Sequence, residues 1–202
     1  MIIATAGHID HGKTTLIRAL TGIDPTRHAQ ARERGMTIDL GFAALKTDDA
    51  EQASIAFVDV PGHEKFVRNM ICGVAGVDAV LLVIAADEGP MPQTIEHLRI
   101  LDLLGIDTGV VVLSRIDRCD ASRVSQAHAE LGALPRTGLL THARVIEVSA
   151  HRGEGMEGLR REILSLARGR RSRSSAGRFR LAVDRSFTID GAGLVVTGTV
   201  FA

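Results

Sequence analysis

The first stretch that could do chemistry lies near the N-terminus, where the sequence is Gly7-His8-Ile9-Asp10-His11-Gly12-Lys13-Thr14-Thr15. Glycines at this spacing let backbone N–H groups wrap around phosphate oxygens, and a helix that begins here adds positive potential. The lysine of such a loop bridges the β- and γ-phosphates, and the hydroxyl after it ligates Mg²⁺. An apolar run precedes the loop and an apolar helical pattern follows it. We therefore predict that these residues bind a nucleoside triphosphate, with Lys13 as a catalytic residue and Thr14 as a metal ligand.

A second group of candidates closes the apolar run at 55–60. Asp59 stands at the end of this predicted strand, where a carboxylate can hold the hydrated Mg²⁺ of a nucleotide. Gly62 can offer its backbone N–H to the γ-phosphate. His63 follows directly, in the position where a group that orients the attacking water is needed, so we predict that His63 is catalytic.

Thr37 is the third predicted metal ligand, after Thr14 and Asp59. It lies in the segment Arg34–Asp39, next to the polar, arginine-rich stretch Asp24–Arg34. Such a stretch has too little apolar surface to pack until something orders it. A threonine hydroxyl that completes the Mg²⁺ shell would couple this ordering to the γ-phosphate.

Two further segments are predicted to recognise the base. The first is Ser114-Arg115-Ile116-Asp117, which follows the apolar run 109–113. Guanine presents N1–H and N2–H₂, two donors that one carboxylate accepts together, whereas adenine would leave the Asp117 carboxylate unpaired. The second segment is Ser149-Ala150, which can supply a backbone N–H to the guanine O6 atom. These segments favour guanine as the base.

These loops need a scaffold that brings them together. Continuous apolar runs recur along the sequence, which is typical of parallel strands buried on both faces. The predicted strands are Ile2–Ala6, Ile55–Val60, Ala79–Ala86, Gly109–Leu113 and Val145–Val148, with Leu40–Leu45 as an antiparallel edge strand. Helices are predicted from Pro92 to Gly105 and from about Met156 to Arg168. The order predicts an α/β domain of the P-loop NTPase kind over residues 1–168, with a mostly parallel, doubly wound sheet.

The composition changes after Arg168. Residues 169–178 are rich in Arg, Ser and Gly and predict an exposed linker. Beyond it, Phe179–Thr188 and Gly193–Phe201 are predicted to form two strands around a hairpin turn. Two strands alone are not stable in water, so residues 179–202 are interpreted as the start of a second domain.

The overall composition excludes several classes of protein. The 202 residues carry 24 Lys+Arg against 24 Asp+Glu, so bulk charge gives no argument for binding nucleic acid or membrane. Two cysteines without a CxxC spacing argue against a disulfide framework and favour a reducing, cytoplasmic location. Neither a membrane-spanning run nor a signal peptide is predicted.

In this order the motifs resemble the G domain of translational GTPases, and specifically that of selenocysteine-specific translation elongation factors. The resemblance is carried by Met1–His8, Arg34–Gly41, Asp59–Phe66, Phe179–Thr188 and Gly191–Thr199. It implies GTP/GDP and Mg²⁺ as cofactors, hydrolysis of GTP, and a β-barrel that begins after the linker. It also implies delivery of selenocysteyl-tRNA to a ribosome paused at a UGA codon. The C-terminal domains with which that family binds a selenoprotein mRNA hairpin are not within these 202 residues.

The sequence departs from the family at one point. Ser114 and Arg115 stand where the guanine motif usually has Asn and Lys, whereas Asp117 is kept. We expect guanine specificity to survive this change, because Asp117 is the carboxylate that discriminates between bases.

Other functions stay open at this stage. One is another translational GTPase, of the elongation factor Tu or initiation factor 2 type, which selectivity among charged tRNAs would distinguish. A second is a non-translational switch that uses GTP to dock a protein partner without ribosome-stimulated hydrolysis. A third is a P-loop enzyme that uses ATP, which competition with ATP would test.

Overall fold

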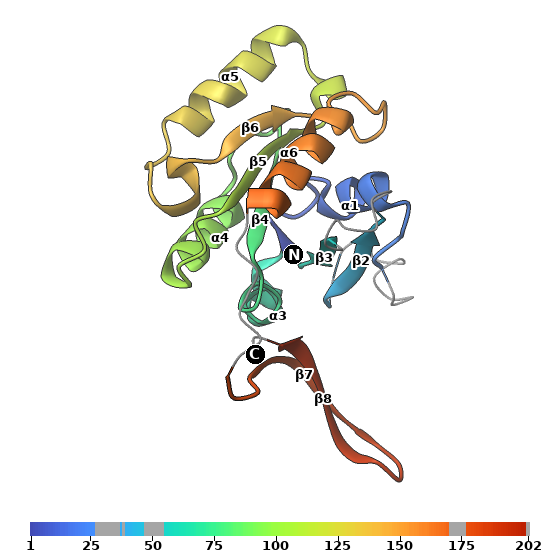
Figure 1. The fold of residues 1–202 in the computed structure, drawn as a ribbon. Helices are drawn as coiled ribbons and strands as arrows, with labels where there is room; N and C mark the ends of the chain where they lie inside the picture. The colour runs from blue at the N-terminus through green and yellow to red at the C-terminus, as the bar shows by residue number, and fades with distance from the viewer. Residues whose placement is uncertain (27–36, 38, 47–54, 170–176, 201–202) are drawn as a thin grey trace.

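The computed structural model describes residues 1–26, 37, 39–46, 55–169 and 177–200. Its centre is a six-stranded sheet in the order β2-β3-β1-β4-β5-β6 (Figure 1). The strands are β1 (Ile2–Ala6), β2 (Gly41–Leu45), β3 (Ile55–Asp59), β4 (Ala79–Ala85), β5 (Gly109–Ser114) and β6 (Arg144–Glu147). Neighbouring strands are parallel except β2 and β3, which pair antiparallel at the sheet edge. The predicted mostly parallel sheet is confirmed.

Strand β4 shows why the apolar runs are continuous. All seven of its residues are buried, and six of them, residues 79–84, alternate between two apolar clusters on opposite faces of the sheet. Leu82 and Ile84 belong to one cluster, whereas Leu81 and Val83 belong to the other. A strand in this position needs helices on both sides, which the doubly wound connection provides.

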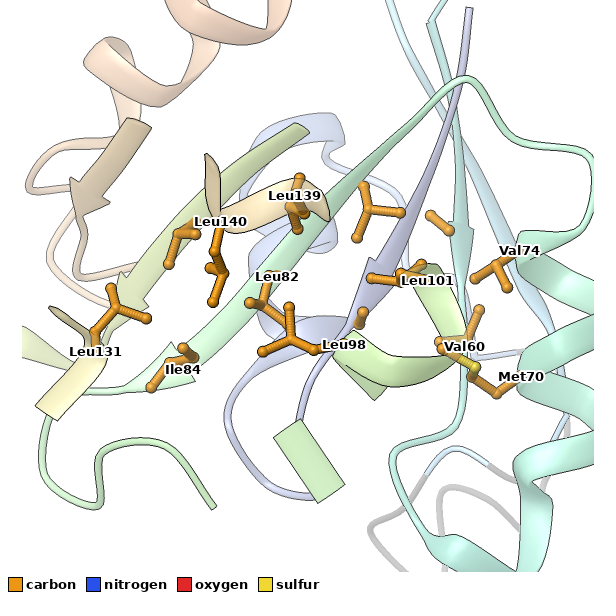
Figure 2. Packing of buried hydrophobic residues seen from close by; sticks show 14 of the residues in the cluster. Val60, Met70, Val74, Leu82, Ile84, Leu98, Leu101, Leu131, Leu139 and Leu140 are labelled. Carbon is orange, nitrogen blue, oxygen red and sulfur yellow. The ribbon is translucent and has the colours of Figure 1, made fainter. Parts of the chain in front are cut away.

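Helices cover both faces of the sheet. α3 (Val67–Val74), α4 (Pro92–Leu103) and α5 (Ala121–Gly132) pack on one face, and α1 (Lys13–Thr21) and α6 (Met156–Gly169) pack on the other. Figure 2 shows the first cluster, in which Met70 and Val74 of α3 and Leu98 and Leu101 of α4 lie over the sheet. Within the described residues, no helix has the length and apolar character that crossing a bilayer requires.

The predicted elements agree with the structure to within two residues at each described end. The sequence did not specify α3, α5 or the short 3₁₀ helices η1 (Glu64–Phe66), η2 (Ile116–Arg118) and η3 (Gly138–Thr141). In α5 only Ala127 and Leu131 are buried, so its apolar face is too sparse to stand out in the sequence. Its start is marked instead by Asp120, whose side chain accepts the N–H of Arg123 at 2.8 Å.

The C-terminal segment forms the predicted antiparallel hairpin. Its strands are β7 (Leu181–Ile189) and β8 (Gly193–Val200), and they lie beside α3 in Figure 1. α6 extends one residue past the predicted end of the G domain at Arg168, through Gly169. Residues 170–176 of the predicted linker and Phe201 of the second predicted strand lie outside the described residues.

Candidate nucleotide-binding site

A cavity of about 530 Å³ opens where loops after β1, β5 and β6 meet. Loops so distant in sequence meet because parallel strands end at the same edge of a sheet. Most of the predicted binding residues line the cavity: Ile9, Asp10, Gly12, Lys13, Thr14, Thr15, Thr37, Gly62, Ser114, Arg115, Asp117 and Ala150. Leu16, Arg118 and His151 also line it, although no sequence signal singled them out. The other candidates, Gly7, His8, His11, Asp59, His63 and Ser149, do not line it.

The predicted phosphate loop, Gly7–Lys13, depends on its two glycines. Gly7 has φ 123°, and a Cβ at this position would collide with the carbonyl oxygen of Val83 in β4. Gly12 is the N-cap residue of α1 and has φ 92°. Because L side chains rarely adopt such angles, glycine is required for the loop to lie close to the sheet and then turn into the helix.

Lys13 is buried at the first position of α1. Its Nζ donates to the carbonyl oxygens of Gly7 at 3.0 Å and of His8 at 2.6 Å. Burial lowers the pKa of the Lys13 ammonium group to about 8, although the nearby Asp59 carboxylate opposes this shift. An ammonium group with so little water around it would interact strongly with a phosphate.

The three predicted metal ligands converge. The Thr14 hydroxyl donates to Asp59 Oδ2 at 2.6 Å, and Thr37 Oγ1 lies 3.0 Å from Thr14 Oγ1 and 3.4 Å from Asp59 Oδ2. The other carboxylate oxygen, Oδ1, accepts the Thr5 hydroxyl at 3.0 Å. Burial raises the pKa of Asp59, although the Thr14 hydroxyl and the Lys13 ammonium group oppose this shift.

This set of oxygens fits a magnesium ion. One carboxylate and two hydroxyls are hard ligands, and a Mg²⁺ ion typically takes few protein ligands and completes its shell with water and phosphate oxygens. No group of three His, Cys, Asp or Glu side chains that could hold a metal is found in the described part of the chain. The oxygens of Thr14, Thr37 and Asp59, which lie within 3.4 Å of one another, form the candidate metal site.

Gly62 and His63 follow the end of β3. A Cβ at Gly62 would collide with Lys13 Nζ and lie 2.7 Å from the backbone nitrogen of Ile9, so this turn packs directly against the phosphate loop. The His63 side chain caps η1, where its Nδ1 accepts the N–H of Lys65 at 3.2 Å. His63 thus lies next to the site, with its ring outside the cavity lining.

Ser114 and Arg115 brace the phosphate loop from β5. The Ser114 hydroxyl donates to the carbonyl oxygen of His11 at 2.7 Å. The Arg115 guanidinium contacts the carbonyl oxygen of Asp10 and pairs with Glu88 at 3.2 Å. Asp10 and Arg115 are the non-glycine residues with positive φ in the described ranges, at 59° and 58°. Ser114 and Arg115 therefore tie the segment predicted to recognise the base to the loop.

Asp117 lines the cavity, together with Ala150. A hydrogen bond from the Ser149 hydroxyl lowers the pKa of Asp117, because it stabilises the carboxylate. Ser149 is itself buried and lies two residues after the end of β6. Its hydrogen bond therefore favours the charged form of Asp117, the predicted base-reading carboxylate.

Helix α4 supplies contacts that the sequence did not reveal. His97 Nδ1 accepts the backbone N–H of Gly7 at 2.9 Å, and the Gln93 side chain accepts that of Ile9 at 2.9 Å. The ring of His11 is fully buried and packs against His8, with 5.1 Å between ring centres. Two loop histidines thus serve packing, while α4 fixes two amides of the loop.

Comparison with known proteins agrees with this geometry. Residues 1–168 match the family model described as the elongation factor Tu GTP binding domain. The selenocysteine-specific elongation factor of Escherichia coli is 48% identical over 202 residues, 100% of this chain and 32% of its own length. That of Desulfomicrobium baculatum is 50% identical over 199 residues, 98% of this chain and 31% of its own length.

Solved structures give the same relationship. A bacterial selenocysteine-specific elongation factor, EF-Sec, matches with a TM-score of 0.89 and 39% identity, covering 100% of this chain and 34% of that one. The factor SelB from Methanococcus maripaludis, in complex with the GTP analogue GppNHp, matches with a TM-score of 0.82 and 34% identity, covering 99% of this chain and 41% of that one. The chain spans about a third of the length of these bacterial relatives. Because the family model matches residues 1–168, most of its length, the chain belongs to the elongation factor Tu GTP-binding domain family.

Proposed function

We propose that this chain binds GTP with Mg²⁺ and hydrolyses it to GDP and phosphate. The observation that carries the proposal is the convergence of Thr14, Thr37 and Asp59 within 3.4 Å at the end of a phosphate loop. The same cavity extends to Asp117, which can accept the two donors of guanine. Adenine would leave that carboxylate unpaired.

In the proposed reaction, water attacks the γ-phosphorus and the bond to the β–γ bridging oxygen breaks. Lys13 and the loop amides stabilise the negative charge that develops on the phosphate oxygens. Thr14, Thr37 and Asp59 would hold Mg²⁺, and the bound ion would neutralise part of the same charge. His63 orients the attacking water, which requires a turn of its side chain from its present place at η1.

We further propose that the protein to which this chain belongs delivers selenocysteyl-tRNA to ribosomes paused at UGA codons. The support is the similarity of these 202 residues to selenocysteine-specific elongation factors, at 48% identity over 202 residues and 50% over 199. Such a protein acts where ribosomes are, in the cytoplasm. Contact with the mRNA hairpin of selenoprotein genes would come from C-terminal domains outside these 202 residues.

Nucleotide competition tests the first proposal. With labelled GTP and Mg²⁺ bound to the protein, unlabelled GTP should displace the label at concentrations at least a hundredfold below those of ATP, since a site that pairs with guanine donors rejects bases without them by about 10⁴–10⁵. Displacement at equal concentrations of ATP would disprove the guanine assignment.

Protection of charged tRNA tests the second proposal. The whole protein with GTP should slow hydrolysis of the aminoacyl ester of selenocysteyl-tRNA, and leave seryl-tRNA on the same tRNA body unprotected. Protection of initiator methionyl-tRNA instead would favour an initiation factor. This alternative is considered because the gamma subunit of translation initiation factor 2 from Thermococcus onnurineus is 35% identical over 175 residues, 77% of this chain and 43% of its own length. Absence of any tRNA protection would favour a non-translational switch.

A further inference from the structure

Arg185, in strand β7, contacts the segment that follows Thr37. Its Nη2 donates to the carbonyl oxygen of Leu40 at 2.8 Å and lies 3.0 Å from Asp39 Oδ2. The guanidinium carbon lies 5.7 Å from the centre of the Phe42 ring. A single side chain from outside the six-stranded sheet thus holds a backbone carbonyl, a carboxylate and an aromatic ring of one short segment.

The local structure of the hairpin aims Arg185 at this segment. Val183 pairs with Gly198 and Arg185 pairs with Thr197, so Asp184 is an extra residue on β7. The Thr197 hydroxyl donates to Asp184 Oδ1 at 2.6 Å across this bulge. A β-bulge redirects the side chains next to it, and here the redirected side chain reaches the G domain.

The contacted segment leads directly to the metal site. Leu40 is buried in the cluster that includes Met70 of α3, so its backbone is fixed from the inside. Arg185 fixes the same backbone from the outside. Thr37 is only two residues before Asp39, and two residues of extended chain reach about 7 Å. An anchor at 39–40 therefore restricts the positions that the Thr37 hydroxyl can take.

We propose that Arg185 is a positioning residue for Thr37, supplied to the magnesium site by the segment beyond the G domain. The inference rests on the proposed function, because a fixed Thr37 matters only when Mg²⁺ and a γ-phosphate are bound. The side chains of Arg185 and Asp39 are 29% and 33% exposed, so the contact is better shielded from water than a surface ion pair. Binding of the triphosphate and docking of the hairpin must then strengthen each other by the same factor.

The test compares two arginines of the same segment. Arg185→Gln removes the contact, and Arg180→Gln makes the same charge change at an exposed residue just before β7. With Mg²⁺ present, Arg185→Gln should weaken binding of GppNHp about fivefold to tenfold and that of GDP less than about twofold, because a lost hydrogen bond to a charged group costs about that much. Arg180→Gln should bind both nucleotides as the wild type does.

A double-mutant cycle separates positioning from general stability. If Arg185 acts through Thr37, then Arg185→Gln should have no further effect on GppNHp binding in a Thr37→Ala background. A full effect in that background, an equal loss for GppNHp and GDP, or wild-type binding by Arg185→Gln would each overturn the proposal. Should Arg185→Gln not fold, Arg185→Lys is measured in the same cycle, since it keeps the charge but loses the planar fork.

Failure of this inference is distinguishable from failure of the proposed function. A wild-type protein that binds neither GppNHp nor GDP contradicts the function itself. A wild-type protein that binds both, with Arg185→Gln indistinguishable from it, contradicts only the role of Arg185.

Discussion

At the scale of single residues, the surroundings of His63 restrict what it can do. Its Nδ1 accepts the N–H of Lys65, so the neutral ring carries its proton on Nε2. While this bond holds, Nε2–H can donate to a water oxygen but cannot take a proton from it. The turn toward the attacking water that the proposed reaction requires would break the bond to Lys65, so the proposed role of His63, orientation of the water, is tested by replacing the residue.

Replacement of His63 tests this role. We expect His63→Ala to lower kcat for GTP hydrolysis by about a hundredfold or more, and to leave the Kd for GTP within about twofold, because the ring acts only on the attacking water. Single-turnover hydrolysis and equilibrium binding measure the two quantities. His142→Ala, at an exposed histidine, is the control. An equal loss in binding and hydrolysis would contradict the assignment.

The proposed base recognition also depends on one residue, Asp117. Xanthine has an acceptor oxygen where guanine has its N2 amine, so the amide of an Asp117→Asn variant should pair with xanthine instead. We expect this variant to prefer XTP over GTP, with GTP binding weakened about a hundredfold by the loss of two hydrogen bonds to a charged group. Asp120→Asn, which conserves the cap of α5, should keep the wild-type preference. Unchanged selectivity in Asp117→Asn would show that this carboxylate does not read the base.

At the scale of elements, the candidate nucleotide-binding site includes a close contact between the turn after β3 and the phosphate loop after β1. The two strands are parallel neighbours, which places Gly62 against Ile9 and Lys13. Both loops can approach this closely because glycine has no side chain to separate them. Helix α4 adds the third support through Gln93 and His97.

An added methyl group at this contact should therefore disrupt catalysis. The Cβ of a Gly62→Ala variant would lie 2.7 Å from the Ile9 nitrogen, a backbone atom that cannot give way without moving the loop. We expect kcat/KM for GTP to fall about a hundredfold, the typical cost of a misplacement near 1 Å. Gly158→Ala in α6, where no atom lies within 4 Å of the added Cβ, should keep full activity and raise stability by about 0.5–1 kcal/mol. Full activity in Gly62→Ala would refute the close-contact argument.

At the scale of the whole molecule, buried histidines link stability to pH. Burial lowers the pKa of His97 to about 4 and that of His11 to about 3, against an ordinary value of 6.5. Between each lowered pKa and 6.5, the histidine concerned binds more protons in the unfolded chain than in the folded one. Stability from these residues is therefore fully present above pH 6.5 and is lost as pH falls through the folded pKa.

Removal of one such residue should flatten this dependence. For His97 the gap between pH 6.5 and 4 corresponds to about 3 kcal/mol of unfolding free energy. We expect His97→Asn, whose amide oxygen can still accept the N–H of Gly7, to lose less stability than the wild type on acidification over this range. Urea unfolding of the nucleotide-free protein at a series of pH values measures the slope, and His142→Asn is the control. Identical slopes for wild type and His97→Asn would contradict the burial argument.

Features of the protein that neighbouring residues in the sequence specify could be predicted, whereas features that depend on residues far apart in the sequence could not. The strand at 79–85 and the loop at 7–14 are specified by adjacent residues, since a continuous apolar run and a glycine spacing both act locally. Helix α5 was not specified, because its buried face consists of two residues. The fold class and the candidate site were therefore largely predictable, and the weakly amphipathic elements were not.

The sequence by itself determined which residues are proposed to carry the chemistry: the phosphate loop, Asp59, Thr37 and Asp117 are present as residue types at fixed spacings. Only the tertiary structure decided what holds them. Gly7 meets His97 across 90 residues, Ser114 meets His11 across 103, and Arg185 meets Leu40 across 145. Such partners leave no pattern in the sequence, because sheet order and helix packing bring them together only after the chain has folded.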